Sequence, residues 1–404
     1  MLDKHKVSLR QCVLILSGVV VFLLVGSITV LLLAQNLSAP STGNIRVVAR
    51  APQPVNLSSN TLFTGNVYWG RYINDWSQAS ALSYQYPFSR LGEFGRDQYD
   101  AWISGLECPV TSGVNMTSAE EDATLAFNCS PDYLPEAAKW FTIFSLANNH
   151  TDNQGIAGFT ETKTHLAENS IQYFGHYDYQ NVDDVCEVVG LPTKATLDDG
   201  SVTNGTLPVA MCGYHGVFGV PTDESIAAIQ KYAPYMPVVA MPHMGAEYRS
   251  STDELKTNAY HQMIDSGADM VLGDHPHWIQ NTESYNGHLI VYSMGNFIFD
   301  QQDTFEVTRS AAIRVVISTV GDNKDLGKWL QLGEKCRMFK DSCLADAKAQ
   351  GLTKLDLEYK FGAIGTNDAD KINKPATPDQ QSSILQRLNW QYTMNSLQPP
   401  YSSL

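Results

Sequence analysis

The sequence has little positive charge. Its 27 Lys and Arg residues stand against 42 Asp and Glu residues, which gives a formal net charge of −15. Nucleic-acid binding needs clustered Lys and Arg side chains for phosphate contacts, so this balance argues against a nucleic-acid partner and equally against docking on anionic lipid. An acidic surface also repels a polyanionic substrate at long range, unless a bound metal ion reverses the field locally.

Other absences narrow the chemistry further. The sequence has no Cys-x-x-Cys pair, which makes a cysteine-based metal site a weak alternative. It also has no Gly-rich nucleotide loop of the GxxxxGK type, so any ATP-driven step must lie in a partner protein. No internal repeat is visible. Hydrophobic residues make up 43% of the chain, which suits a globular protein with a full core.

The amino-terminal region predicts a membrane anchor. Residues 12–34 carry no charge and exceed the about 20 residues that a spanning helix needs, whereas a cleavable signal peptide has an apolar core of roughly 7–15 residues. Ala34 and Ser38–Ala39 offer cleavage as a weaker alternative. Because residues 1–11 contain Lys and Arg, we place this tail in the cytoplasm. The expected protein is a single-pass cell-membrane protein with an extracytoplasmic carboxyl-terminal domain.

Cysteine usage agrees with an external location. Of the seven cysteines, Cys12 lies within the expected membrane helix, and the remaining even number in an oxidising compartment predicts disulfides. Several pairings are possible. The working hypothesis joins sequence neighbours, namely Cys108–Cys129, Cys186–Cys212 and Cys336–Cys343.

The rest of the chain divides by composition. Residues 35–60 predict a flexible stalk, because they contain several prolines and many Ser, Asn and Ala residues. Residues 61–320 alternate short apolar runs with helical stretches, which predicts an α/β domain. The expected strands are 61–67, 101–106, 140–146, 171–174, 208–212, 237–241, 269–272, 289–293 and 311–319, with helices at 158–169 and 253–266. Residues 321–404 are expected to form an extension with a hairpin or insertion (322–371) and a closing helix (380–395).

Metal-competent side chains follow several of these strands, at the position where α/β folds bind ligands. In GDHPH, a buried strand delivers His275 and His277 on a turn stiffened by Pro276. Two such imidazoles can bind a metal together, or one can bind it while the other positions a substrate. The alternative is a pair of exposed loop histidines without function.

The segment SLANNHTD places further polar groups after an apolar strand: Asn148, Asn149, His150 and Asp152. Asparagine oxygen is a neutral hard ligand that can complete a metal site. A histidine held by Asp152 would match a general acid with an orienting carboxylate. The alternative is an Asx-rich turn that caps the following helix.

Three single residues complete the pattern. Asn66, Glu107 and His243 each stand at or after the end of an expected strand. Taken alone, His243 has a structural role as its simplest interpretation, and so does Glu107 because of the adjacent Cys108. The ordered series of strand ends carrying Asn, Glu, NNH, His and HPH favours a metal-type site in one domain.

The sequence resembles the CapA-type poly-γ-glutamate capsule synthesis proteins, a branch of the calcineurin-like metallophosphoesterases. The resemblance covers roughly residues 61–300. It is densest in FSLANNHTDNQGIAGFTETKTHLAENSIQYFG, in PHMGAEY and in HQMIDSGADMVLGDHPHWIQNTESYNGHLIVYSMGNFIFDQ. It implies a four-layer α-β-β-α sandwich with metals at the sheet edge, here preceded by one transmembrane helix.

The resemblance also implies roles for individual residues. It assigns metal binding, for one or two divalent ions such as Mn, Fe or Zn, to Asn66, Glu107, Asn149, His243, His275 and His277. The candidate catalytic residues are His150 and Asp152, and the candidate substrate-binding residues are Arg71 and Asn148. Asn66 stands where the family usually has an Asp, which removes one negative charge from the first metal site. Met244 replaces a Trp of the family and alters the pocket wall but not the ligand set.

Three functions are compatible with this pattern. The first is synthesis or export of a poly-γ-glutamate-type capsule polymer, beside membrane-bound synthase components and with an anionic polymer as ligand. The second is a metal-dependent phosphoesterase that hydrolyses a cell-surface phosphate ester, with His150 protonating the leaving group. The third is a metal-poor binding scaffold. Fold analogy does not choose among them, so the sequence leaves open whether the protein is an enzyme.

Overall fold

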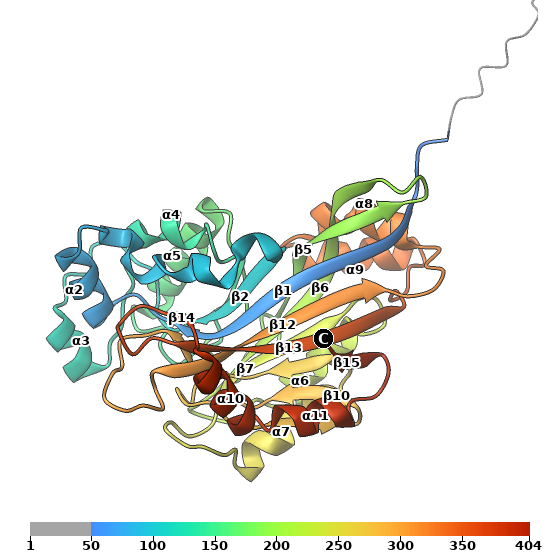
Figure 1. Ribbon diagram of the computed structural model, residues 1–404. Helices are drawn as coiled ribbons and strands as arrows, with labels where there is room; N and C mark the ends of the chain where they lie inside the picture. The colour runs from blue at the N-terminus through green and yellow to red at the C-terminus, as the bar shows by residue number, and fades with distance from the viewer. Residues whose placement is uncertain (1–49) are drawn as a thin grey trace, which may run out of the picture. The chain divides into compact units, whose positions relative to one another are not determined.

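The computed structural model describes residues 50–404, in which residues 52–404 form one compact unit (Figure 1). The expected cytoplasmic tail (1–11), membrane helix (12–34) and most of the stalk (35–60) lie outside the described residues. Within the described residues, no helix is long and apolar enough to cross a membrane.

The strands form one hydrogen-bonded network. Their order along its main path is β14-β13-β12-β1-β5-β6-β7-β8-β10-β9, while β2, β3, β4, β11 and β15 pair outside this path. The bounds are β1 (Pro54–Val67), β2 (Ala101–Leu106), β3 (Ile143–Ser145), β4 (Gln172–Phe174), β5 (Cys186–Leu197), β6 (Val202–Gly216), β7 (Val238–Met244), β8 (Met270–Leu272), β9 (Thr282–Tyr285), β10 (His288–Val291), β11 (Asn296–Ile298), β12 (Arg309–Thr319), β13 (Leu357–Asn367), β14 (Lys374–Pro375) and β15 (Tyr401–Ser403).

The long strand β1 is shared by two arms of this network, and Figure 1 shows it running through the centre of the strands. Its first residues pair with β5, and its later residues pair in parallel with β2. One arm continues in parallel from β2 to β3 and β4, and the other continues from β6 to β7, β8 and β10, again in parallel. The arms meet again where His176 bridges Tyr214. The carboxyl ends of both parallel sets therefore approach each other.

Alternating side chains of β1, β2 and β3 separate two hydrophobic cores, as the two-residue period of a strand requires. Phe63, Ile103 and Ile143 pack in the core that also contains the second arm. Their neighbours Leu62, Trp102 and Phe144 face the other core, which helices cover. Because apolar groups cover both faces of these strands, the polar residues that follow them are held by a rigid base.

The helices cover the outer faces of the two arms. The bounds are α2 (Arg71–Ala79), α3 (Ser118–Thr124), α4 (Leu134–Ala137), α5 (Gly155–Glu168), α6 (Asp223–Ala227), α7 (Glu254–Asp265), α8 (Leu326–Cys336), α9 (Lys340–Ala349), α10 (Pro378–Arg387) and α11 (Trp390–Ser396), with 3₁₀ turns η1 (Ser83–Phe88), η2 (Leu91–Phe94), η3 (Arg96–Gln98), η4 (Pro131–Tyr133) and η5 (Ala228–Lys231). Helices α2, α4 and α5 contribute side chains to the core that contains Leu62, Trp102 and Phe144. Helices α7 to α11 contribute to the core that contains Phe63, Ile103 and Ile143. The predicted α/β class is confirmed, and the sheet-rich arrangement is consistent with a metallophosphoesterase-like domain.

Several boundaries differ from the prediction. Strand β1 begins at Pro54, so the last residues assigned to the stalk are sheet. Residues 322–371, expected as a hairpin or insertion, contain α8, α9 and all of β13. The expected closing helix is two helices, because Asn389 has a φ of 53° and separates α10 from α11. Residues 321–404 also belong to the same compact unit as the rest, since β13 pairs along all of β12.

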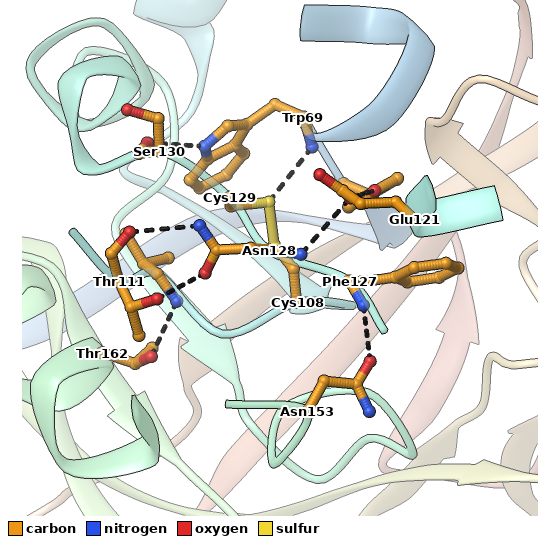
Figure 2. The surroundings of a disulfide bond; sticks show 12 residues. Trp69, Cys108, Thr111, Glu121, Phe127, Asn128, Cys129, Ser130, Asn153 and Thr162 are labelled. Carbon is orange, nitrogen blue, oxygen red and sulfur yellow. Dashed lines mark hydrogen bonds between the residues drawn. A yellow bond between two sulfur atoms is a disulfide. The ribbon is translucent and has the colours of Figure 1, made fainter. Parts of the chain in front are cut away.

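The three predicted disulfides are present: Cys108–Cys129, Cys186–Cys212 and Cys336–Cys343. The first lies directly after β2, beside Glu107. Figure 2 shows how it fixes the following segment: the backbone N–H of Phe127 donates to Oδ1 of Asn153, and Asn128 bonds Thr111 through its side chain. This disulfide thereby ties the strand end that carries Glu107 to the loop that follows β3.

Candidate functional site

The parallel strands bring the predicted residues to one edge. Asn66 lies near the end of β1, Glu107 follows β2, and His243 lies near the end of β7. His275 and His277 lie in the loop after β8. At Gly65, an added Cβ would lie 1.8 Å from the carbonyl oxygen of Gly295, so only glycine permits this approach of β1 to the loop before β11. The close approach sets Asn66 beside the loop after β8.

One group of three side chains converges most closely. Nε2 of His243 lies 2.8 Å from Oδ1 of Asn149 and 3.1 Å from Nδ1 of His275. All three residues are buried. Ligand atoms at about 2.1 Å from one octahedral metal ion lie about 3 Å apart, so these separations suit ligands of a shared ion.

Asp274 orients this group. Its Oδ1 lies 2.8 Å from Nδ1 of His243. When the ionised carboxylate accepts from Nδ1–H, the Nε2 lone pair faces Asn149 and His275. Burial is the largest cause that raises the pKa of Asp274, and Lys256 opposes it. Gly105 makes room for this carboxylate, because an added Cβ there would lie 2.2 Å from Asp274 Oδ2. A carboxylate behind a histidine is the usual support of a metal ligand.

His277 belongs to a second group. Its Nδ1 lies 2.7 Å from Oδ1 of Asn296 and 3.3 Å from Nδ2 of Asn66. Its Nε2 points toward the carboxylates of Glu107, at 3.6 Å, and Glu247, at 3.9 Å. Asn66 makes amide contacts here where a carboxylate would supply charge. Glu107 and Glu247 are therefore the anionic groups nearest this histidine.

Glu107 has an unsatisfied oxygen. Among residues 50–404, its buried Oε2 has no hydrogen-bond partner. Burial is the largest cause that raises the pKa of Glu107, and the negative charges of Asp274 and Glu247 add to the effect. An unpaired carboxylate oxygen at this depth is costly unless a cation or proton joins it.

Burial also keeps the site histidines neutral. Desolvation lowers the pKa of His243 and of His275 well below the usual value, and it lowers the pKa of His277 to about 4. The His150 pKa is likewise lowered to about 4, chiefly by burial. Neutral imidazole is the form that binds metal ions, so the environment favours ligation.

His150 is positioned differently from the prediction. Its Nδ1 lies 2.9 Å from Oδ1 of Asn153, and its ring stacks on Phe127 with centroids 3.9 Å apart. Among the described residues, no hydrogen bond joins it to Asp152, and Asn153 makes the contact expected of that residue. The catalytic role of Asp152 stays a prediction. The turn after β3 directs the side chain of Asn153, and not that of Asp152, toward the His150 ring.

Arg71, the first residue of α2, is held by two carboxylates. Its Nε and Nη2 donate to the two oxygens of Asp300, each at 2.6 Å, and its Nη1 donates to Asp122 at 3.1 Å. Hydrogen bonds and charge attraction from Asp300 raise the Arg71 pKa despite the opposing effect of burial, which is the largest single cause. Its guanidinium also lies over the Phe127 ring, 4.8 Å from the centroid. Arg71 thus contacts the same ring as His150.

One cleft of about 320 Å³ lies beside these residues. Its walls are Arg71, Glu107, Asp122, Leu125, Phe127, His150, Glu247, Tyr248, His277, Phe299, Gln301 and Asp303. Asn66, Asn149, His243 and His275 do not line this cleft. Asn148 is buried too, where its Oδ1 accepts from the backbone N–H of His150, and its predicted substrate role stays a prediction.

The backbone is strained around the site. His275 and His277 have φ values of 89° and 59°, and the cleft residues Arg71 and Tyr248 have 44° and 55°. Left-handed backbone is costly for residues with a Cβ and persists where the surrounding structure enforces it. Its concentration on four residues of one site indicates that their side-chain directions are functionally constrained.

The donor set fits a divalent metal ion. Within the part of the chain that is described, no three His, Cys, Asp or Glu side chains gather closely enough to hold an ion by themselves. A metal ion held here would therefore need Asn149 as the third ligand beside His243 and His275. The unpaired Oε2 of Glu107 and the Nε2 of His277 offer two further donors at the cleft.

The sequence analysis missed several contributors: Asn153, Glu247, Tyr248, Asp274, Asn296 and Asp300. Asp274 precedes His275 directly, so its place at a strand end could have indicated it. Asn296 begins the short strand β11 and Asp300 follows it, and no periodicity marks this strand.

Comparisons with known proteins found one matching family model and two relatives. A family model described as Bacterial capsule synthesis protein PGA_cap matches residues 60–301. The PGA biosynthesis protein CapA of Bacillus subtilis (strain 168) is 27% identical over 278 residues, which are 63% of this chain and 67% of that protein. The Capsule biosynthesis protein CapA of Bacillus anthracis is 25% identical over 271 residues, which are 62% of this chain and 63% of that protein.

The matched residues contain every candidate metal ligand, from Asn66 to His277, together with Arg71 and His150. They end just after Asp300, so strands β12 to β15 and helices α8 to α11 lie outside the match. The family match covers more than half of the chain. The chain therefore belongs to the PGA_cap family of bacterial capsule synthesis proteins and is of the CapA type.

Proposed function

We propose that this protein acts in the synthesis or export of an anionic capsule polymer of the poly-γ-glutamate type, through one divalent metal ion bound at the sheet edge. The observation that carries the proposal is the convergence of two atoms on His243 Nε2: Asn149 Oδ1 lies 2.8 Å from it and His275 Nδ1 lies 3.1 Å from it. The kinship with the two CapA proteins supplies the polymer class. The domain around this site is proposed to be a four-layer α-β-β-α sandwich of the metallophosphoesterase type.

The cleft suits a carboxylate-bearing ligand only if positive charge is added. Glu107, Asp122, Glu247 and Asp303 line it, against Arg71 as its cation. Arg71 is already paired with Asp300 and Asp122, so it cannot offset the remaining acids. When bound, a divalent ion supplies the charge that attracts and polarises an anionic oxygen. Without it, the cleft repels an acidic polymer.

His150 favours binding over hydrolysis. Burial lowers its pKa to about 4, so the ring is neutral near pH 7. With Nδ1 bonded to Asn153 Oδ1, the other ring nitrogen is left as an acceptor. A neutral acceptor can receive a hydrogen bond from a polymer amide, but it lacks the proton that a general acid must give to a leaving group.

Hydrolysis of a cell-surface phosphate ester is the second candidate function. It is favoured by the position of His150, Arg71 and Glu107 on one cleft beside His277. A metal-poor scaffold is the third, favoured by the neutral Asn66 next to His277. In all three, an amino-terminal membrane helix would hold the domain outside the cell, next to membrane-bound synthase components.

The test combines metal content with polymer production. We expect the wild-type chain to contain about one equivalent of Mn, Fe or Zn, and His275→Ala to lose it. In cells that depend on this gene for their capsule, His275→Ala should remove surface polymer while the protein level stays normal. His288→Ala is the matched control, because His288 lies outside the cleft and bonds the Asp269 carbonyl.

Two further measurements separate the candidates. Turnover of an aryl phosphate that disappears in His275→Ala would replace the polymer role with the phosphoesterase. Normal capsule in His275→Ala together with no bound metal would leave the metal-poor scaffold. Asn66→Asp should add a carboxylate beside His277 and raise the metal content toward two equivalents. An unchanged content would show that the substitution does not limit the second position.

A further inference from the structure

A second unsatisfied polar group lies away from the cleft. Asp368 and Asn373 are only 4% and 2% exposed. Among residues 50–404, both carboxylate oxygens of Asp368 and both amide atoms of Asn373 are buried without a hydrogen-bond partner. Four such atoms in two residues are far from the normal state of a protein interior, where buried polar groups are paired. Both residues lie beyond the segment shared with the capsule synthesis family.

The strand register places these two side chains together. In the β13–β14 hairpin, Thr366 is opposite Pro375 and Asn367 is opposite Lys374. Continuing this register by one residue sets Asp368 opposite Asn373, at the base of the connecting loop. Directly opposite residues project to the same side with Cβ atoms about 4.5–5.5 Å apart. This register brings the buried carboxylate and the buried carboxamide toward one another at the base of the loop.

The nearby lysines are engaged elsewhere. The ammonium of Lys371 lies 4.7 Å from the centroid of the Trp76 ring, and Lys374 pairs with Asp370. The charges that act on Asp368 are those of Asp370 and Asp300, both negative, and with burial as the largest cause they raise its pKa. The buried carboxylate thus lacks a counter-charge of its own.

We propose that Asp368 and Asn373 form a binding site for one hard divalent cation, with Ca²⁺ as the ion that fits best. The carboxylate can bind through two oxygens and the carboxamide through one, and water or main-chain carbonyls complete the shell. Ca²⁺ accepts such oxygen ligands in irregular geometry, whereas Mg²⁺ demands a near-ideal octahedron. The absence of histidine and cysteine from the pair separates this site from the nitrogen-rich group around His243.

The site would fix the wall of the cleft. The backbone N–H of Asp368 donates to Thr308, and its carbonyl accepts from the side chain of Gln302. These residues belong to the segment that begins with Asp300, the partner of Arg71. On the other side of the loop, Lys371 contacts Trp76 of α2, the helix that begins with Arg71. A cation here links both partners of the Arg71–Asp300 pair to the carboxyl-terminal hairpin.

Calcium titration of the full-length chain tests the proposal. The chain is stripped with EGTA and carries His243→Ala and His275→Ala, so that the sheet-edge group does not contribute. Calorimetry should detect one Ca²⁺ per chain, and Asp368→Asn should weaken binding at least about tenfold. Asp370→Asn is the matched control, an exposed acid of the same loop, and it should change the affinity by less than about twofold.

Thermal unfolding of the otherwise wild-type chain gives a second readout that does not need the histidine variants. In EGTA, Asp368→Asn should melt above wild type, because it removes an uncompensated buried carboxylate. In saturating Ca²⁺ the order should reverse, because only wild type gains the binding energy. Three results would each overturn the proposal: no Ca²⁺ binding, equal affinity in Asp368→Asn, or a melting order that Ca²⁺ does not change. The buried Asp368 side chain would then be explained by protonation of its carboxylate. The result is independent of metal content at His275.

Discussion

Nε2 of His243 lies 3.1 Å from Nδ1 of His275, and both rings are buried. Two neutral imidazoles at this distance face each other with one proton or one cation between them. When Nδ1 of His243 donates to Asp274, its Nε2 offers a lone pair. The proposed metal ion would occupy the space between the two rings, and the first prediction tests the contribution of the Asp274 carboxylate to its binding.

Asp274→Asn should weaken metal binding by about 10–100-fold, because the orienting carboxylate raises the basicity of His243 and fixes its tautomer. The measurement is competition with a chelator of known affinity. Asp303→Asn is the control, since Asp303 lines the cleft without a hydrogen bond to a site histidine. Equal losses in both variants would indicate a general charge effect and not an orienting contact.

Substitutions at Asn153 should move the pKa of His150 in opposite directions. Asn153→Ala should lower it further, because the Asn153 contact favours the charged ring. Asn153→Asp should raise it, since a carboxylate stabilises imidazolium more strongly. NMR titration of the His150 ring reports both shifts. Asp152→Ala should leave the titration nearly unchanged, and a large shift there would restore the orienting role expected from the sequence.

Arg71→Ala should destabilise the protein by about 3–5 kcal/mol, because it leaves the buried Asp300 carboxylate unpaired. The double variant Arg71→Ala/Asp300→Ala should lose less than the sum of the two single changes, which denaturant unfolding and a double-mutant cycle can measure. Asp122 is more than half exposed, so Asp122→Ala should cost no more than about 1 kcal/mol. Additive losses at Arg71 and Asp300 would contradict the pairing.

The metal-free protein should lose stability as the pH falls from about 6.5 to about 4. In this range the unfolded histidines bind protons, whereas His150 and His277 stay neutral in the folded state because burial lowers each pKa to about 4. Stability therefore rises with pH across this window, and these two groups add no slope above it. One pKa unit corresponds to about 1.4 kcal/mol per group.

Denaturant unfolding at pH 7.5, 5.5 and 4.5 measures this effect. His277→Gln should show a shallower fall than wild type, because it removes one of the titrating rings while keeping a polar side chain. Parallel curves for the two proteins would mean that His277 keeps an ordinary pKa when folded.

Much of the site could be predicted from the sequence. The apolar runs before Asn66, Glu107, His243 and GDHPH mark strands by local pattern alone, and parallel strands bring their carboxyl ends to one edge. For the strand ends, the determining information lies within a few neighbouring residues. The pairing of cysteines nearest in sequence was one hypothesis among several, and the structure confirms it.

Tertiary structure decided what depends on register and close packing. The turn after β3 sets Asn153 and not Asp152 against His150, and the loop before β11 brings Asn296 to His277. The antiparallel register of β13 and β14 places Asn367 opposite Lys374, and continuing it by one residue places Asp368 opposite Asn373. The sequence by itself determined which strand ends carry the metal-competent residues, because hydrophobic period is local. Which atoms face each other depends on backbone turns and on contacts between distant segments, and only the folded chain determines those.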